Sequence, residues 1–356
     1  MGLLRRRIVV LLLLVAVWGG LQPTFAAQFG DLYTVTVMVD PEAEDPRQDG
    51  FQRAMGALLV RLTGRRDAAD DPDLLDVIEA AARFVQRWGF VEEERLAVTF
   101  DGRALEGELV RRDQPVWGGD RPLTLVWMAL DTGGGDRRML NGLETPLEED
   151  LDAQLVTSVL TELADTARRR GLPLVYPLLD TEDLALVTAA DIWGGFTSRV
   201  VEASRRYQPD GILIGRVRAV GDVRTARWQY LGADEQRERR GGISEGLEWL
   251  ADIYASQYAV SGGNSIARLV VTDVRNFDDY ARVITHLERL PMIDAVSVEE
   301  LREDQLLVAL ETRGTADVLN RALSLGGVIT PVTAPLAEPR AVGLDRTTAR
   351  YFRIMR

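Results

Sequence analysis

Residues 267–290, with the sequence ARLVVTDVRNFDDYARVITHLERL, contain the two patterns that decide the fold. Ala267–Val274 is rich in β-branched residues and predicts a strand, whereas Phe277–Leu290 repeats its apolar residues at helical spacing. Two extended runs, a helix and a short fourth strand follow, at 295–300, 305–311, 315–325 and 327–332. The resulting order βαββαβ is that of the split-βαβ, ferredoxin-like sandwich.

The N-terminal part of the chain shows a related order. A strand is predicted at 32–39 and an amphipathic helix over 51–62, and Gly64 stands where a helix ends in the left-handed conformation. Asp71-Pro72 predicts the start of a second helix. Two extended runs and a final helix follow, at 83–90, 95–100 and 102–112. We interpret this βααββα order as a ferredoxin-like unit with one added helix.

The region between these ends begins with a nearly continuous apolar strand, 122–130, as expected of a strand covered on both faces. A long helix is predicted to end at Arg170, before Gly171. A short strand, two helices, a hairpin and a closing helix follow, at 172–177, 181–190, 195–207, 210–231 and 244–260. The polar residues 232–242 are interpreted as a surface loop.

The sequence therefore predicts an α+β / α/β chain, with ferredoxin-like βαββα units at both ends of a central α/β domain that has a mixed sheet. The predicted divisions are a signal peptide, an N-terminal domain, the central domain, a C-terminal domain and an arginine-rich tail, at 1–27, 28–117, 118–262, 263–333 and 334–356. Two interpretations of the tail stay open: it is attracted to an acidic partner, or it is solvated and 351–355 adds an edge strand.

The first residues are typical of a secretory signal peptide. Arg5–Arg7 precede an apolar run, Ile8–Trp18, and Thr24-Phe25-Ala26 supplies small residues for cleavage after Ala26 or Ala27. The alternative is a membrane anchor, but about eleven apolar residues fall short of the roughly 20 that cross a bilayer. We expect a periplasmic mature chain without a transmembrane span.

The composition excludes many chemistries. The chain has no cysteine, its 42 basic residues are all arginine, and His286 is the one histidine. Thiol nucleophiles, Schiff-base lysines and Cys/His zinc sites are thereby excluded. His286 falls at the edge of the apolar stripe of its helix, so we interpret it as structural. No catalytic residue, metal ligand or cofactor is predicted.

Carboxylates are the remaining catalytic candidates. Acidic clusters occur at 70–73, 92–94, 148–150 and 278–279. A glycan hydrolase needs a pair of carboxyl groups that face each other across a cleft. Three of the clusters instead fall at predicted helix starts, where negative charge offsets the helix dipole, and the fourth is a hairpin tip. A carboxylate-dependent envelope hydrolase is therefore the alternative, and not the leading, hypothesis.

The net charge also restricts the partners. The formal charge is −13, and removal of residues 1–27 makes it −16, because that segment contains three arginines and no acid. Such an acidic chain repels phosphate backbones, so no nucleic-acid partner is expected.

Local positive charge gathers in the predicted central hairpin, near two aromatic residues. This candidate binding surface consists of Arg216, Arg218, Arg224, Arg227, Trp228 and Tyr230. Guanidinium groups bind carboxylates through paired donors and stack on rings, so the set could hold an anion, a glycan or an acidic partner. The alternative is the ordinary charged face of a sheet.

Three segments carry a family resemblance: 33–37 (YTVTV), 59–67 (LVRLTGRRD) and 115–127 (PVWGGDRPLTLVW). In these segments the chain resembles the proteobacterial exported family known as domain of unknown function 2066. The resemblance implies export, and the family supplies no activity or catalytic residues.

The leading hypothesis is an exported, non-catalytic protein that binds another component of the envelope, most simply an envelope protein. The alternatives are the hydrolase above and a small-ligand binding protein, which needs a closed apolar pocket with a few polar groups. The oligomeric state is left open by the sequence.

Overall fold

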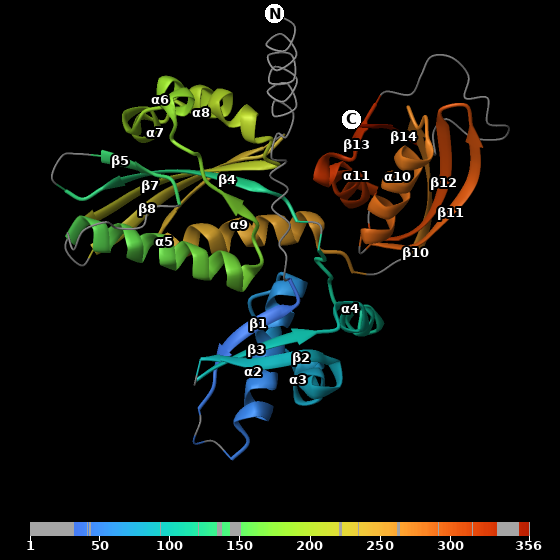
Figure 1. The fold of residues 1–356 in the computed structure, drawn as a ribbon, viewed down its shortest axis with the longest axis horizontal. Coiled ribbons are helices and arrows are strands. Elements are labelled where there is room, and N and C mark those ends of the chain that lie inside the picture. The colour runs from blue at the N-terminus through green and yellow to red at the C-terminus, as the bar shows by residue number, and fades with distance from the viewer. Residues whose placement is uncertain are drawn as a thin grey trace, which may run out of the picture.

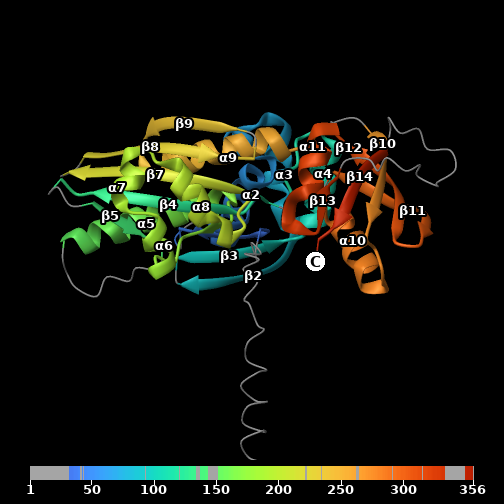
Figure 2. The same ribbon diagram turned by 90° about the horizontal axis from the view of Figure 1, so that it is seen from above.

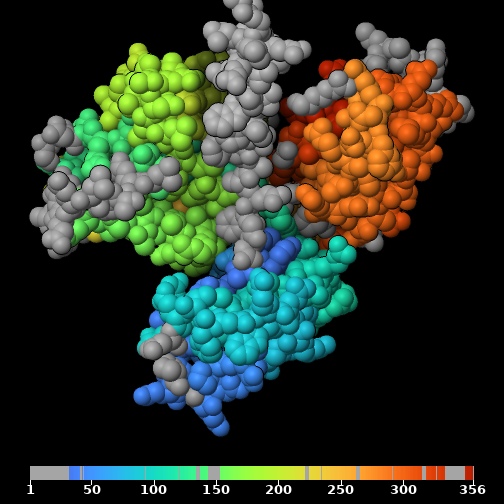
Figure 3. Space-filling model, viewed as in Figure 1, coloured from blue at the N-terminus to red at the C-terminus, as the bar shows by residue number. Residues whose placement is uncertain are grey.

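A computed structural model describes residues 32–40, 42, 44–92, 94–119, 121–133, 137–142, 151–220, 223–233, 235–261, 264–290, 292–314, 316–332 and 349–355. The predicted signal peptide, the acidic cluster at 148–150 and most of the arginine-rich tail lie outside these residues. Within them, no helix is both long enough and apolar enough to cross a membrane. The class is mixed α+β, as predicted, and the space-filling view shows an N-terminal, a central and a C-terminal lobe (Figure 3).

The N-terminal unit has the predicted βααββα order. Its elements are β1 (Thr34–Met38), α2 (Pro46–Thr63), α3 (Leu75–Glu79), β2 (Val85–Glu92), β3 (Arg95–Phe100) and α4 (Gly102–Arg111), with short 3₁₀ turns around α3. The three strands form one antiparallel sheet in the order β1-β3-β2. The third strand therefore lies between the first two, and β1 and β2 are the edges.

Helix α2 is defined by local signals at both of its ends. The Asp45 side chain accepts a hydrogen bond from the Gln48 N–H at 3.0 Å, with Pro46 in the first turn. At the other end Gly64 has a φ of 71°. A Cβ there would lie 2.3 Å from the Cβ of Ala255 on α9 (Ile243–Tyr258). Glycine is therefore required both by the left-handed turn and by the close approach of the central unit.

The central unit is built on a mixed six-stranded sheet. Its strands are β4 (Thr124–Asp131), β5 (Arg137–Leu140), β6 (Leu174–Val175), β7 (Gly211–Val220), β8 (Val223–Leu231) and β9 (Gln236–Gly241). The order is β5-β4-β7-β8-β9, with β6 paired to β4. Strands β4 and β7 are parallel, whereas β7, β8 and β9 form antiparallel pairs. The predicted mixed sheet is thus confirmed.

Helices cover both faces of this sheet, which explains why every residue of β4 is buried (Figure 1). One face packs on α5 (Leu151–Arg170) and α9 through a core that includes Val126, Leu213 and Trp228. The other face packs on α6 (Thr181–Leu186), α7 (Ala189–Gly194) and α8 (Thr197–Ser204) through Trp127, Ile192 and Ile214. The arrangement is a three-layer α/β unit.

Two predictions for the central unit are wrong. The segment 232–242 is not a loop, because Gln236–Gly241 forms the edge strand β9; its exposed, charged residues give no apolar alternation to detect. The helix predicted over 181–190 breaks at Val187, where Thr188 begins α7 with a capping box. The Thr188 side chain accepts from the Asp191 N–H, and the Asp191 carboxylate accepts from the Thr188 N–H.

The start of α6 gives a pH-dependent prediction. Arg206 and the N–H groups of Asp183 and Glu182 bind the Asp180 carboxylate and lower its pKa to about 2. The stabilisation is complete above the ordinary pKa of 3.8 and is lost as the pH falls towards 2. We expect the melting temperatures of the native protein and of Asp180→Asn to converge as the pH is lowered through this range. Thermal unfolding followed by circular dichroism at several pH values checks this, and a constant difference would contradict it.

The C-terminal unit has a five-stranded sheet with helices on one face. Its elements are β10 (Asn264–Thr272), α10 (Phe277–Arg289), β11 (Ile293–Arg302), β12 (Gln305–Arg313), α11 (Ala316–Ser324), β13 (Ile329–Pro331) and β14 (Ala349–Ile354). The strand order is β11-β12-β10-β14-β13. The predicted strands and helices are present, but their order is not that of a ferredoxin-like sheet, because β14 lies between β10 and β13.

One interpretation of the tail predicted that its last residues form an edge strand. This is wrong, because β14 lies inside the sheet. β14 pairs in parallel with β10 and antiparallel with β13. Tyr351 and Phe352, adjacent residues that face opposite sides of the sheet, are both buried. A strand that buries apolar side chains on both faces is more stable inside the sheet than at its edge.

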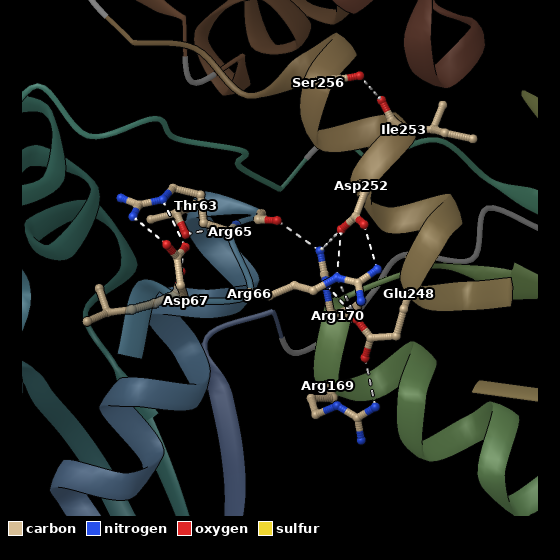
Figure 4. Close-up of polar contacts among 12 residues, drawn as sticks. Thr63, Arg65, Arg66, Asp67, Arg169, Arg170, Glu248, Asp252, Ile253 and Ser256 are labelled. Carbon is tan, nitrogen blue, oxygen red and sulfur yellow. Dashed lines mark hydrogen bonds and ion pairs between the residues drawn. The ribbon is translucent and has the colours of Figure 1, made fainter. Parts of the chain in front are cut away.

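A buried arginine, Arg170, and a half-exposed one, Arg66, join the N-terminal and central units. Arg170, only 1% exposed, donates to Glu248 at 2.5 Å, to Asp252 at 3.0 Å and to the Gly64 carbonyl at 2.8 Å (Figure 4). Arg66, just after α2, binds Asp252 at 2.5 Å. The two carboxylates lie one helical turn apart on α9, so they bind arginines from α5 and from the N-terminal unit at once. The end of α2 is thereby fixed against the central unit.

Candidate functional site

The structure separates the six residues of the predicted binding surface. In the β7–β8 ladder Arg216 lies opposite Arg227 and Arg218 lies opposite Thr225, on the face that carries α6–α8. Arg224, Trp228 and Tyr230 are on the other face. Trp228 and Tyr230 are buried under α5 and α9, and Trp228 donates to the Gly242 carbonyl at 3.0 Å. The predicted aromatic part of the surface is therefore wrong: the two rings are core residues.

A different constellation forms around the three arginines that share a face. β9 places Arg240 opposite Arg227, so Arg216, Arg227 and Arg240 lie in one row across three adjacent strands. Arg218 lies two residues after Arg216 on β7. Asp131 on β4 separates it from Arg137, because Asp131 lies opposite Arg218 on one side and opposite Arg137 of β5 on the other. We call Arg137, Arg216, Arg218, Arg227 and Arg240 the arginine surface. Figure 2 shows β9 to one side of α6–α8, away from their cover.

This row is electrostatically unfavourable for the isolated protein. Neighbouring strands are about 4.8 Å apart, and like charges directly opposite each other destabilise a sheet. Burial, followed by the charge of Arg227, lowers the pKa of Arg216. Within the described ranges, no hydrogen bond or ion pair holds the guanidinium groups of Arg218, Arg227 and Arg240. These three side chains are exposed.

Two carboxylates lie on the same face and offset part of the charge. Asp131 is 3.7 Å from Arg137, and Glu238 is two residues from Arg240 along β9. Five arginines against two acids leave the surface positive on a chain whose net charge is −13. The surface is therefore complementary to an anionic partner and opposite in sign to the chain as a whole.

The end of α7 and the residues that lead into α8 border the arginine surface and carry two aromatic rings. The Arg137 guanidinium stacks on Trp193, with its Cζ 4.4 Å from the ring centroid. Arg216 donates to the Ile192 carbonyl at 2.7 Å and to Gln229 at 2.9 Å. Phe196, which directly follows the pair Gly194-Gly195, is exposed. The surface thus contains two arginines that are held by neighbouring groups, Arg137 and Arg216. Its other three arginines make no hydrogen bond or ion pair with the residues that the structure describes.

The other sequence candidates have structural roles. His286 is buried between α10 and α11, with its Nε2 3.1 Å from the Leu323 carbonyl oxygen. Asp71 accepts from the Asp73 N–H and binds Arg65 at 2.6 Å. Asp279 caps the segment before α10 by accepting from the Arg275 N–H. In the part of the chain that the structure describes, no group of three or more His, Asp or Glu residues could hold a metal ion.

A hollow of about 590 Å³ runs along α5. It is lined by Gln154, Thr157, Ser158, Thr161, Glu162 and Asp165. All of these residues come from a single helix, so the hollow is open and lacks the enclosing walls of a small-ligand pocket.

Comparison with known protein families finds a match in the first part of the chain. Residues 26–118 match a family model described as a domain of unknown function (DUF8605). This is a different family from the one that the sequence segments resemble, and its description gives no activity. No curated protein and no solved structure matches the chain.

Residue spacing alone could have revealed part of the arginine surface. Arg224 and Arg227 differ by an odd number of positions, and odd separations along a strand point to opposite faces. Arg240 could not be found in this way, because its segment was expected to be a loop. Arg137 was missed because the four-residue strand β5 has no clear apolar alternation.

Proposed function

We propose that this chain is an exported, non-catalytic protein of the periplasm that binds an acidic segment of another envelope protein through the arginine surface. The in-register row Arg216–Arg227–Arg240 carries the proposal. A sheet that places three like charges side by side is less stable than one with alternating charges. A bound carboxylate-rich segment would remove that repulsion and receive paired donors from each guanidinium group.

Export is part of the same proposal and is supported by the arginine–apolar–small-residue pattern of residues 5–26. A protein partner is favoured because Arg218, Arg227 and Arg240 are exposed, and because the exposed ring of Phe196 follows Gly195, where a Cβ would lie 3.3 Å from the Arg216 guanidinium. Such a face suits an extended polypeptide that carries both acidic and apolar side chains.

Charge reversal at the centre of the row separates binding from folding. Arg227→Glu places a carboxylate between Arg216 and Arg240, so we expect unchanged or slightly higher stability, by up to about 1 kcal/mol. Binding of a fluorescein-labelled glutamate-rich peptide, measured by fluorescence anisotropy, should weaken by about tenfold or more. Arg224→Glu is the matched control, because it makes the same charge change on the same strand but on the opposite face.

The native partner can be sought by site-specific photocrosslinking in intact cells. A crosslinkable residue at Thr225, opposite Arg218, should form adducts with a second protein, and the same group at Arg224 should not. The captured protein should contain an acidic segment, and Arg227→Glu should abolish the adduct. Adducts with this protein alone, or equal adducts at both positions, would refute the proposal.

A further inference from the structure

The N-terminal sheet leaves a long strand at its edge. β2 has eight residues, and among the strands that the structure describes it pairs only with β3. Its other side carries main-chain N–H and C=O groups that can pair with a further strand. Figure 2 shows β2 at the outer margin of this sheet.

The side chains of this edge are unusually apolar for an exposed strand. Trp88, Phe90 and Val91 are 45%, 51% and 58% exposed. The Trp88 and Phe90 rings meet edge to face, with their centroids 6.3 Å apart. Trp88 also packs edge to face on Phe51, with the ring centroids 5.9 Å apart. An exposed edge with large apolar side chains is a site where a second strand adds to a sheet.

Two β-bulges interrupt the pairing of β2 with β3 and leave a regular stretch between them. The β2–β3 register shifts between Val85 and Arg87 and again between Phe90 and Glu92. Arg87 lies opposite Thr99 and Glu92 lies opposite Arg95, positions on one face of β3, whereas Trp88 and Phe90 lie opposite Val98 and Leu96 on the other. The bulge thus brings Arg87 and Glu92 to the same face of the sheet.

This pattern is complementary to itself. If a second β2 is laid antiparallel with the two Gly89 residues facing each other, Trp88 of each copy lies opposite Phe90 of the other. Arg87 of each copy lies opposite Val91 of the other and therefore beside Glu92, which the bulge turns to the same face as Arg87. A Cβ built at Gly89 meets no atom within 4 Å, so no residue that the structure describes occupies the centre of this pairing. Both aromatic pairs and both ion pairs are then repeated by a two-fold axis.

We propose that two copies of this protein pair through β2 and form one continuous six-stranded sheet across the dimer. This inference is independent of the proposed function, since the arginine surface lies on another sheet. We choose a second copy as the partner because the edge is complementary to itself in both respects. Trp88 meets Phe90 of the other copy, and Arg87 meets Glu92.

Charge exchange tests the pairing in the purified full-length protein. Sedimentation velocity over a series of concentrations should show a monomer–dimer equilibrium for the native chain. Arg87→Glu should weaken dimerisation by about tenfold, because the new carboxylate lies near Glu92 of the other copy and the two-fold axis repeats this repulsion. Glu92→Arg should weaken it by a similar factor, because it brings two arginines together in the same way. The double variant Arg87→Glu/Glu92→Arg should recover the dimer relative to either single variant. In the native chain Glu92 also forms a solvent-exposed ion pair with Arg95, with the two charged groups 3.3 Å apart. The double variant breaks this pair too, but an exposed pair contributes little to stability.

Two controls separate pairing from general surface effects. Arg83→Glu makes the same charge change on an exposed residue just before β2 and should leave dimerisation unchanged. Trp88→Lys should abolish the dimer, whereas Phe277→Lys, at an aromatic residue that is 78% exposed on α10, should not. Far-UV circular dichroism checks that each variant is folded. A native protein that is monomeric at all concentrations, or a double variant no better than the single ones, would overturn the proposal.

Discussion

Arg121→Met is expected to lower the free energy of unfolding by about 3 to 5 kcal/mol, because it leaves a cluster of buried carbonyl groups without a donor. The Arg121 guanidinium is buried and stacks on Trp117, with its Cζ 3.9 Å from the ring centroid. It donates to five main-chain oxygens, those of Arg61, Trp117, Gly118, Arg170 and Gly171. These acceptors belong to the end of α2, the connection to β4 and the end of α5, so a single side chain ties three segments together.

Arg121 stays charged at neutral pH despite its surroundings. Burial, followed by the charge of Arg61, lowers the pKa of Arg121 to about 9. Methionine fills similar volume but supplies no donor, whereas lysine keeps the charge with fewer donors in a different geometry. Arg121→Lys should therefore lie between the native protein and Arg121→Met.

Urea unfolding followed by tryptophan fluorescence measures this effect, and Trp117 reports on the site itself. Arg103→Met, at an exposed arginine of α4, is the control and should change stability by less than about 0.5 kcal/mol. A loss below about 1 kcal/mol for Arg121→Met would mean that water replaces the guanidinium without penalty.

The second large effect is expected at Gly246 in α9. A Cβ at this position would lie 2.2 to 2.4 Å from three atoms of the Trp228 indole, which is fully buried. Alanine is favoured over glycine in a helix by about 1 kcal/mol, but this overlap forces α9 away from β8, and overpacking costs about 1 to 3 kcal/mol or more. We expect Gly246→Ala to be destabilising by about 1 to 2 kcal/mol net.

Gly107→Ala on α4 is the matched control. Its new Cβ would meet only the end of the flexible Arg111 side chain, at 3.7 Å. The helix-propensity gain then stands alone, and stability should rise by about 0.5 to 1 kcal/mol. Opposite signs for two glycine-to-alanine changes in helices, measured by urea unfolding, support the packing argument. A stabilising Gly246→Ala would contradict it.

Elements with their own local signals were predictable from the sequence. The helix at 277–290 has a strong apolar stripe and an asparagine N-cap, and it was found within one residue of its end. The turn at Gly64 was predicted because few residues other than glycine adopt a positive φ there. The α6–α7 break had a signal as well, the Thr188–Asp191 capping box, which was overlooked in favour of a longer helix.

Elements whose place depends on a distant partner were not predictable in this way. β9 has no apolar alternation, and its pairing with β8 is decided by main-chain groups that every residue carries. β14 shows extended residues, but its position between β10 and β13 follows from which neighbours bury Tyr351 and Phe352. Strand order is a long-range property, and nearby residues do not encode it.

The candidate site shows the same division. The sequence by itself determined that Arg216, Arg218 and Arg227 lie on strands of a central hairpin in an acidic chain, because composition and period-two alternation are local properties. Only the tertiary structure decided that Arg240 completes the row, that Trp193 replaces Trp228 at its border, and that Trp228 is core. Those facts depend on register across strands and on which sheet face the helices cover, and both are set by the burial of apolar side chains throughout the unit.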